Sequence, residues 1–226
     1  IESDIAKRNF TIICHGYAGS KEMMRQLAFD ISRAGSNVVL FDFIGHGKSQ
    51  ELLVNKPKQI EGTTQQLVEQ LEAVIKEIRK LFGDEVSISL VGHSMASDIV
   101  VRASKNNDIS SVIAISPYSN AISEDFPKDL LLISGQLETH LRASSLDHVV
   151  KIDRSAIENQ TVFKESFRRK ASYINNTGHV SVIYAPQTAK EIIDWLGLSS
   201  NQRTLATTHI ICCLLYTSPS PRDRSL

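Results

Sequence analysis

The sequence predicts a single α/β domain built on a mostly parallel sheet, with helices on both faces. Short apolar runs rich in β-branched residues alternate along the chain with longer segments whose apolar residues recur at helical spacing. Strands that are apolar throughout are typical of parallel sheets, because helices cover both faces of such a sheet. The length of 226 residues fits one domain, and 42% hydrophobic with 22% charged residues is typical of a globular protein.

The elements of the first part of the chain are separated by clear stop signals. Residues 10–14 (FTIIC) are expected to form the first strand, and residues 21–34 a helix that ends at Gly35. Residues 37–43 (NVVLFDF) form the second expected strand. Residues 67–81 carry the clearest apolar stripe of the chain and are therefore predicted to be a helix.

The middle of the chain continues the alternation with almost no connecting residues. Residues 86–91 (VSISLV) predict a third strand, and a helix over 94–105 follows it directly. Residues 112–115 and 130–133 predict two more strands. In an open sheet of this kind, ligands bind beyond the carboxyl ends of the strands, so the residues that follow each strand are the candidates for chemistry.

The last part of the chain is less regular. A helix is expected around 141–150, a sixth strand at 171–174 and a final helix over 187–196. Residues 151–170 are rich in charge and only weakly periodic, so they predict no definite element. Their basic run, Arg168, Arg169 and Lys170, is interpreted either as an edge over the site or as a solvated face.

Composition excludes several classes of function. Twenty-five Lys and Arg balance twenty-five Asp and Glu, which argues against a nucleic-acid-binding protein. No run of about 18 apolar residues is present, so no membrane span is expected in this fragment. Three cysteines (Cys14, Cys212 and Cys213) form neither a disulfide framework nor a metal-binding motif, and Cys14 is expected to be a small core residue.

The two ends of the chain differ from ordinary domain ends. The sequence starts at Ile1 without an initiator Met and enters a strand within ten residues, so we expect the N-terminus to be truncated. Residues 213–223 (CLLYTSPSPRD) resemble the translation of a sequencing-library adapter; the alternative is a native Pro/Ser-rich linker. We therefore expect a folded domain over 1–200, a disordered native remnant over 201–212 and a non-native tail over 213–226.

The strongest chemical signal follows the third strand. The run Gly92-His93-Ser94-Met95-Ala96 leads from a strand straight into a helix, which is the context of a nucleophile elbow. So tight a turn exposes the serine oxygen and leaves room only for small residues two positions before and after it, here Gly92 and Ala96. Ala96 departs from the usual G-x-S-x-G. The alternative function of Ser94 is to cap the helix.

Four motifs in this order make the chain resemble an α/β-hydrolase over about residues 10–197, in the form of a lidless carboxylesterase-like member. Each motif lies in the loop after an expected strand: His15-Gly16-Tyr17, the turn Asp42-x-x-Gly45-His46-Gly47-x-Ser49, the elbow at 92–96, and Asn176-Thr177-Gly178-His179. Only thirteen residues, 117–129, separate the fourth strand from the fifth. We therefore expect no substantial cap domain and an open site.

The resemblance implies a role for the groups near Ser94. Acyl transfer needs N–H donors for the oxyanion, which the family takes from the residue after the nucleophile, Met95, and from the first loop, Tyr17. Gly16 and His93 belong to the turns that shape the site. His15 is expected to stiffen its loop by hydrogen bonding, rather than to transfer protons.

The family's chain order of serine, acid and histidine implies the other two members. His179 lies in a late loop before the last helix and is the expected general base, with a structural histidine as the alternative. Glu138 follows the fifth strand and a glycine break, where the family usually has Asp, and is the expected acid. Asp147 is the first competitor for the acid, and Glu124 or Asp125 the second.

The expected function is a serine hydrolase that cleaves carboxylic esters of a small-molecule acyl substrate through an acyl-enzyme on Ser94. Thioesters and amides use the same groups, whereas a dehalogenase of this fold would need Asp at the nucleophile position. The alternative is a non-catalytic ligand- or partner-binding module. The glycine spacing at 45–48 matches no phosphate loop, so neither a cofactor nor a metal is expected. We expect a cytoplasmic protein, and the sequence does not predict its oligomeric state.

Overall fold

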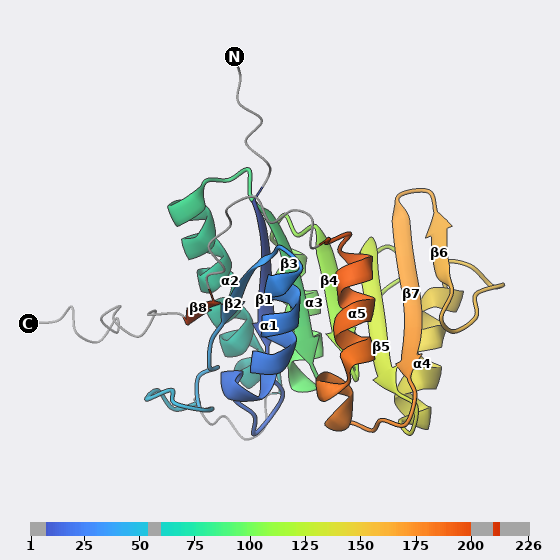
Figure 1. Ribbon diagram of the computed structural model, residues 1–226, viewed down its shortest axis with the longest axis horizontal. Helices are drawn as coiled ribbons and strands as arrows, with labels where there is room; N and C mark the ends of the chain where they lie inside the picture. The colour runs from blue at the N-terminus through green and yellow to red at the C-terminus, as the bar shows by residue number, and fades with distance from the viewer. Residues whose placement is uncertain (1–7, 54–59, 200–209, 213–226) are drawn as a thin grey trace, which may run out of the picture.

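In the computed structural model, which describes residues 8–53, 60–199 and 210–212, strands and helices alternate along the chain (Figure 1). The elements in chain order are β1 (Asn9–Cys14), the 3-10 helix η1 (Lys21–Met24), α1 (Arg25–Arg33), β2 (Asn37–Leu40), α2 (Ile60–Phe82), β3 (Ser87–His93), α3 (Met95–Ser104), β4 (Ser111–Ile115), β5 (Asp129–Gly135), α4 (Thr139–Val150), β6 (Thr161–Lys164), β7 (Phe167–Ile174), the 3-10 helix η2 (Ser181–Tyr184), α5 (Pro186–Trp195) and β8 (Ile210–Cys212). The predicted strands and helices are all present.

The described strands form one sheet in the order β6-β7-β5-β4-β3-β1-β2-β8. All neighbouring strands are parallel except β6 and β7, which form an antiparallel hairpin at one edge. The loops after β1, β3, β4, β5 and β7 therefore emerge along one end of the sheet, where ligands bind in folds of this class. The predicted mostly parallel α/β fold is confirmed.

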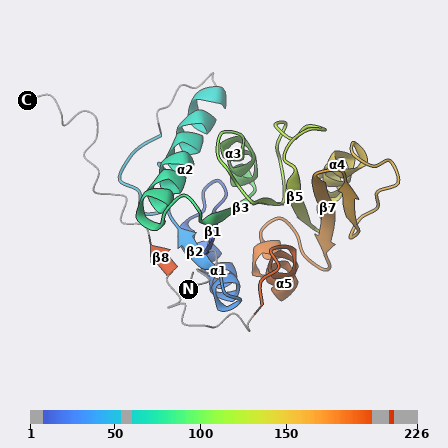
Figure 2. The ribbon, with the colours of Figure 1, turned by 90° about the horizontal axis from the view of Figure 1, so that it is seen from above.

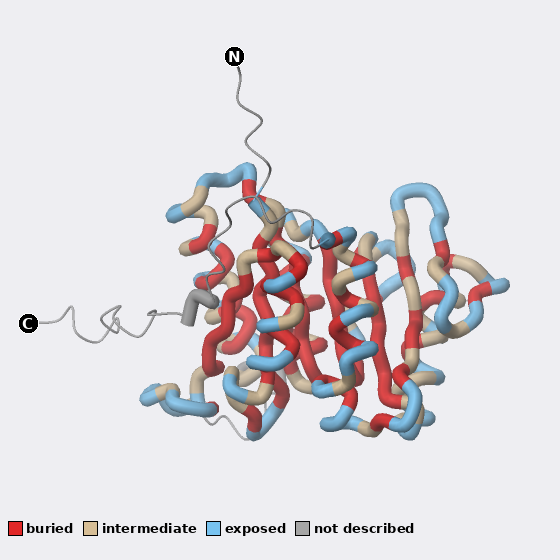
Figure 3. Tube along the Cα trace, in the orientation of Figure 1, coloured by how far each residue is buried: buried red, intermediate tan, exposed pale blue. Residues whose placement is uncertain are grey.

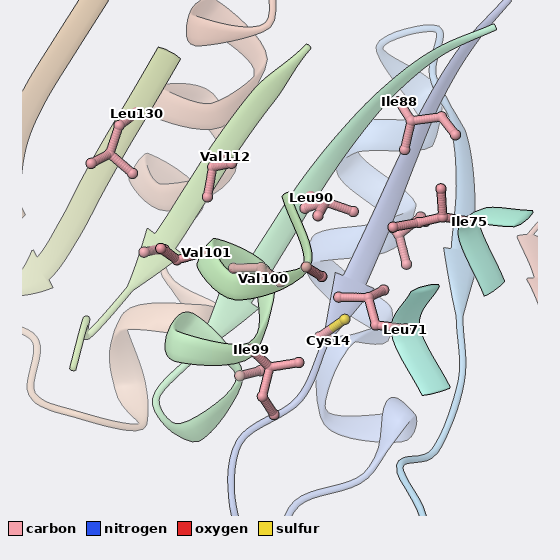
Figure 4. Close-up of a cluster of buried hydrophobic side chains, with 14 of the residues drawn as sticks. Cys14, Leu71, Ile75, Ile88, Leu90, Ile99, Val100, Val101, Val112 and Leu130 are labelled. Carbon is pink, nitrogen blue, oxygen red and sulfur yellow. The ribbon is translucent and has the colours of Figure 1, made fainter. Parts of the chain in front are cut away.

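Helices cover the two faces of the sheet, as expected. Figure 2 shows α1 and α5 on one face and α2, α3 and α4 on the other. Side chains alternate along each strand, so Ile13 packs into the core under α1 and α5, whereas Ile12 packs into the core under α2 and α3. The central strands are buried along their length (Figure 3). Cys14 lies in the core near Leu71 and Leu90, confirming its prediction as a core residue (Figure 4).

The connection between β4 and β5 contains no helix and no strand over residues 116–128. The absence of a substantial cap at this point agrees with the short spacing in the sequence. As a result, the loops that carry the predicted site residues meet solvent directly.

The charged stretch 151–170, which predicted no definite element, contains β6 and the start of β7. The basic run 168–170 is not a free edge, because Arg168, Arg169 and Lys170 each bond to another part of the protein. Arg168 donates to Asp129 and stacks over Trp195. Arg169 is fully buried and donates to the carbonyl oxygens of Pro127, His148 and Glu124. Burial lowers the pKa of Arg169 to about 10. The basic run therefore stabilises the sheet near its edge and does not form an edge over the site, whereas most of the preceding stretch 151–166 is exposed, as a solvated face would be.

The structure differs from the expected disorder at 201–212 in one place. Residues 210–212 form β8, which pairs in parallel with β2. Residues 201–209 of the expected remnant and the predicted non-native tail over 213–226 lie outside the described residues, as do residues 1–7. Among the helices that the structure describes, none combines the length and the apolar character needed to cross a bilayer.

Candidate active site

Ser94 lies in a tight turn between β3 and α3, as the elbow motif predicts. Its backbone has φ 54° and ψ −116°, a left-handed conformation that costs free energy in a residue other than glycine. A Cβ at Gly92 would lie 2.3 Å from the carbonyl oxygen of Ala96, so only glycine fits there. Ala96 itself is fully buried, and the turn accommodates its methyl group. The geometry therefore explains both the glycine and the small residue of the motif.

The structure brings Ser94, His179 and Glu138 into one chain of hydrogen bonds. The Nε2 atom of His179 lies 2.8 Å from the Ser94 hydroxyl, and its Nδ1 atom lies 2.6 Å from Oε1 of Glu138. A carboxylate can only accept, so Nδ1 carries the proton and donates to Glu138. The lone pair of Nε2 then faces Ser94, which is the tautomer that a general base requires.

Glu138, rather than any of its competitors, contacts the imidazole. Its side chain is only 7% exposed, whereas the His179 side chain is 47% exposed. The competing carboxylates lie on the surface: Asp147 in α4, Glu124 and Asp125 in the loop between β4 and β5.

Two donors hold the second oxygen of the Glu138 carboxylate. Oε2 accepts from the backbone N–H of Gly135 at 2.6 Å and from the hydroxyl of Ser116 at 2.8 Å. Ser116 follows β4 and was not a predicted site residue, because a single serine after a strand has no motif. Its nearness to the acid follows from the strand order, which places β4 between β3 and β5.

His93, the second residue of the elbow, ties the His179 loop to β3. Its Nε2–H donates to the backbone carbonyl of His179 at 2.7 Å, and the two rings lie 5.1 Å apart. Burial is the largest cause that lowers the pKa of His93, so the ring is neutral near pH 7. His93 therefore links two segments that are 86 residues apart in the sequence.

The first loop lies directly against the nucleophile. A Cβ placed on Gly16 would be 3.1 Å from the Cβ of Ser94, and the N–H of Gly19 donates to Gly16 at 3.1 Å to close a turn around Tyr17. Met95 is the first residue of α3, where the N–H groups have no acceptor within the helix. Both predicted oxyanion donors thus belong to segments next to Ser94. Their hydrogen bonds to an oxyanion stay a prediction.

Two hydrogen bonds of the His15 ring stabilise the loop after β1. Its Nε2 accepts from the N–H of Phe43 at 3.1 Å, so its Nδ1–H donates to the carbonyl of Gly16 at 2.9 Å. Burial is the largest cause that lowers the pKa of His15, which favours this neutral ring. Both nitrogens are engaged away from Ser94, in agreement with the bracing role expected of His15.

The turn that starts at Asp42 is held together by its carboxylate. Asp42 accepts from the N–H groups of Lys21 and Lys48 and forms an ion pair with the Lys21 ammonium. Burial alone would raise the pKa of Asp42, but these hydrogen bonds and the ammonium charge lower it overall. The turn thereby fixes the wall of the site next to the first loop.

Several large apolar or aromatic side chains are exposed on the loops at the end of the sheet where the candidate site lies. Tyr17, Tyr118, Leu137 and Val180 are large, exposed and carried by the loops that follow β1, β4, β5 and β7. In the part of the chain that the structure describes, no three His, Cys, Asp or Glu side chains gather as metal ligands would.

Comparison with known proteins agrees with this architecture. The family described as "Serine aminopeptidase, S33" matches residues 6–185. "Probable lysophospholipase L2" from Haemophilus influenzae is 27% identical over 136 residues, which are 59% of this chain and 42% of that protein. The match thus spans less than half the length of this relative.

Solved structures share the fold at low sequence identity. TT1662 from Thermus thermophilus has a TM-score of 0.59 at 15% identity, over 85% of this chain and 89% of that one. Dienelactone hydrolase from Anabaena variabilis has a TM-score of 0.58 at 14% identity, over 88% and 86%. XC6422 from Xanthomonas campestris, described as an α/β serine hydrolase without lid, has a TM-score of 0.55 at 18% identity, over 86% and 82%. With a family match over most of its length, on this fold and with these motifs, the chain belongs to the serine aminopeptidase S33 family of α/β-hydrolases.

Proposed function

We propose that this protein is a serine hydrolase that cleaves carboxylic esters through an acyl-enzyme on Ser94. The observation that carries the proposal is the unbroken hydrogen-bond chain from the Ser94 hydroxyl through His179 to Glu138. A serine hydroxyl becomes an effective nucleophile when an oriented base accepts its proton, and this chain supplies that arrangement.

The reaction proceeds in two stages, acylation of Ser94 and hydrolysis of the acyl-enzyme. The Ser94 oxygen attacks the carbonyl carbon while His179 Nε2 takes the hydroxyl proton, and the N–H groups of Tyr17 and Met95 stabilise the oxyanion. The intermediate collapses as the imidazolium returns that proton to the leaving alkoxide, which leaves an acyl-Ser94. His179 Nε2 then takes a proton from water as the water oxygen attacks the acyl carbon, and the imidazolium returns that proton to the Ser94 oxygen as the ester bond breaks and the carboxylic acid leaves. Glu138 stabilises the imidazolium in both halves.

The open site favours a small or surface-presented acyl group. Without a cap between β4 and β5, the exposed Tyr17, Tyr118, Leu137 and Val180 are the apolar surfaces that an acyl group would contact. The Haemophilus relative is described as a lysophospholipase, which supports esters with one acyl chain as a substrate class for this protein. Thioesters and amides would react through the same groups, so the leaving group is part of the test.

The test is turnover of p-nitrophenyl esters of increasing acyl length, beside a matched thioester and anilide, by the full chain. We expect ester hydrolysis that falls to background in Ser94→Ala. Ser104→Ala is the control, because this buried serine of the same helix bonds only locally, to Val101. Unchanged turnover in Ser94→Ala would show that another group is the nucleophile. No turnover of any substrate by folded protein would favour the alternative, a non-catalytic binding module.

A further inference from the structure

We propose that Ser116 is a positioning residue that holds the carboxylate of Glu138 in line with His179; this inference rests on the proposed function. The sheet order gives Ser116 its place. Because β4 and β5 lie between β3 and β7, the hydrogen-bond chain that joins Ser94, after β3, to the loops after β5 and β7 must bridge the end of β4. Ser116 is the first residue after β4, so it lies beneath that bridge.

The contacts of Ser116 hold its hydroxyl in place to bind the carboxylate of Glu138. The residue is fully buried, and its hydroxyl donates to Oε2 of Glu138 at 2.8 Å. Its N–H donates to Ile133 at 2.6 Å, which fixes the backbone of Ser116 to the neighbouring strand. With the N–H of Gly135 on the same oxygen, Oε2 is fully engaged and Oε1 is left to face His179.

The backbone of Ser116 supports a role beyond filling space. Its φ is 48°, a left-handed conformation that glycine adopts with less strain than serine. A serine at such a position carries a cost, which its hydroxyl offsets by the charge-assisted bond to Glu138. The backbone conformation and the bond thus favour the same role.

The pairing also accounts for glutamate where the family usually has aspartate. The Glu138 side chain turns back over its own loop, so that one carboxylate meets Gly135, Ser116 and His179 together. An aspartate is one methylene shorter and has less reach from the same backbone position. Ser116 and Glu138 therefore act as a unit, and the effect of one depends on the other.

The test is a double-mutant cycle of Ser116→Ala and Glu138→Gln, measured by kcat on a p-nitrophenyl ester. We expect Ser116→Ala to lower kcat by about 10-fold with little change in KM, because a bond to a charged group is lost. In the Glu138→Gln background the same change should alter kcat by less than about 2-fold, since the charge it orients is absent. Equal losses in both backgrounds would indicate a merely structural serine and overturn the proposal.

A second readout needs no substrate. The Nδ1–H of His179, bonded to a carboxylate, gives a proton NMR signal far downfield, which Ser116→Ala should shift or broaden. Ser134→Ala is the matched control, because this serine is equally buried one strand away and bonds to Ser145 instead. Ser116→Gly removes the same hydroxyl with a relaxed backbone, and it replaces Ser116→Ala if that variant fails to fold.

The two readouts separate this inference from the proposed function. An altered His179 signal in Ser116→Ala, in a protein that turns over no ester, would sink the esterase proposal and leave the role of Ser116 intact. An unchanged signal and an unchanged kcat in Ser116→Ala, beside turnover that depends on Ser94, would sink only the role of Ser116.

Discussion

Ser94 and His179 share a hydrogen bond, but different kinds of contact hold the turn of Ser94 and the loop of His179 in place. Ser94 is held by its own pentapeptide, in which the backbone at Gly92 passes too close to Ala96 for any side chain. The loop of His179 also has local hydrogen bonds, from the Gly178 N–H to Ser181 and from the Thr177 hydroxyl to Ile174, but distant segments hold it as well. Its carbonyl is held by His93, and the N–H of Leu137 donates to Thr177 at 3.0 Å.

The contact between the acid loop and the histidine loop shows how close this docking is. A Cβ at Gly135 would lie 2.6 Å from the carbonyl oxygen of Thr177, so a glycine at the end of β5 lets the two loops meet. The nucleophile is thus fixed mainly by neighbours in sequence, with its N–H bonded to Ile115 of β4, whereas the base depends more on segments that are distant in sequence. We expect changes at the elbow to affect stability, and changes in the docking contacts to affect turnover first.

The largest effect after loss of Ser94 is expected at the acid. Glu138→Gln removes the charge that stabilises the imidazolium, so kcat should fall by about 10³- to 10⁴-fold. The measurement is steady-state hydrolysis of a p-nitrophenyl ester. Asp147→Asn, on the exposed side of α4, is the control and should leave kcat unchanged. The reverse pattern would transfer the role of acid to Asp147.

Gly92→Ala tests whether close local packing fixes the turn of Ser94. The added methyl group would meet the backbone of Ala96, which cannot move without disturbing α3, so we expect a loss of about 1–3 kcal/mol in the free energy of unfolding. Chemical denaturation measures it. Gly178→Ala is the control, because a Cβ there has nothing within 4 Å. Equal destabilisation by the two variants would mean that the elbow is not close-packed.

His93→Phe tests whether the hydrogen bond from His93 holds the loop of His179. A phenyl ring keeps the packing against the His179 ring but cannot donate to its carbonyl, so kcat should fall by about 10-fold with a smaller loss of stability. Steady-state kinetics beside thermal unfolding separate the two effects. His140→Phe, on the exposed surface of α4, should change neither. A His93→Phe enzyme with full activity would show that this bond does not hold the loop.

The smallest effect concerns pH and a histidine outside the site. Burial, followed by the charges of Lys151 and Arg169, lowers the pKa of His148 from 6.5 to about 4, whereas Asp147 raises it. Among the described residues, its Nδ1 is one of the buried side-chain atoms without a hydrogen-bond partner. The unfolded chain therefore takes up the proton first, and His148 makes the protein less stable as pH falls from 6.5 to about 4.

His148→Gln removes this titration and should flatten the fall of unfolding free energy over that pH range. Urea unfolding at a series of pH values measures the slope. His140→Gln, whose side chain is on the surface, is the control and should leave the slope as it is. An unchanged slope in His148→Gln would mean that the buried ring does not titrate in this range.

The sequence predicted those features of the protein that a local pattern of residues encodes. Periodicity predicted the alternation of strands and helices, and the strand–turn–helix context predicted the nucleophile, because both are properties of neighbouring residues. The strand order, the antiparallel β6–β7 hairpin and the burial of Arg169 are set by pairing across the sheet, which no local pattern records. The charges of residues 168–170 concealed the first half of β7, because their partners come from other segments.

The same distinction applies within the site. Glu138 and His179 were predicted from the resemblance to a family and its chain order, not from any pattern around them. Ser116 was missed because its partner is 22 residues away and no motif includes it. A serine that directly follows an expected strand was the only available signal, and Ser134, directly after the strand expected over 130–133, gives the same signal.

Covalent labelling of the folded chain with a fluorophosphonate, followed by mass spectrometric mapping of the adduct, shows directly whether Ser94 is an activated nucleophile. An activated serine displaces the fluoride and forms a stable phosphonate ester, so we predict one adduct, on the peptide that contains Ser94, and slower labelling in His179→Ala. An adduct on a different serine, or none on folded protein, would show that Ser94 is not an activated nucleophile.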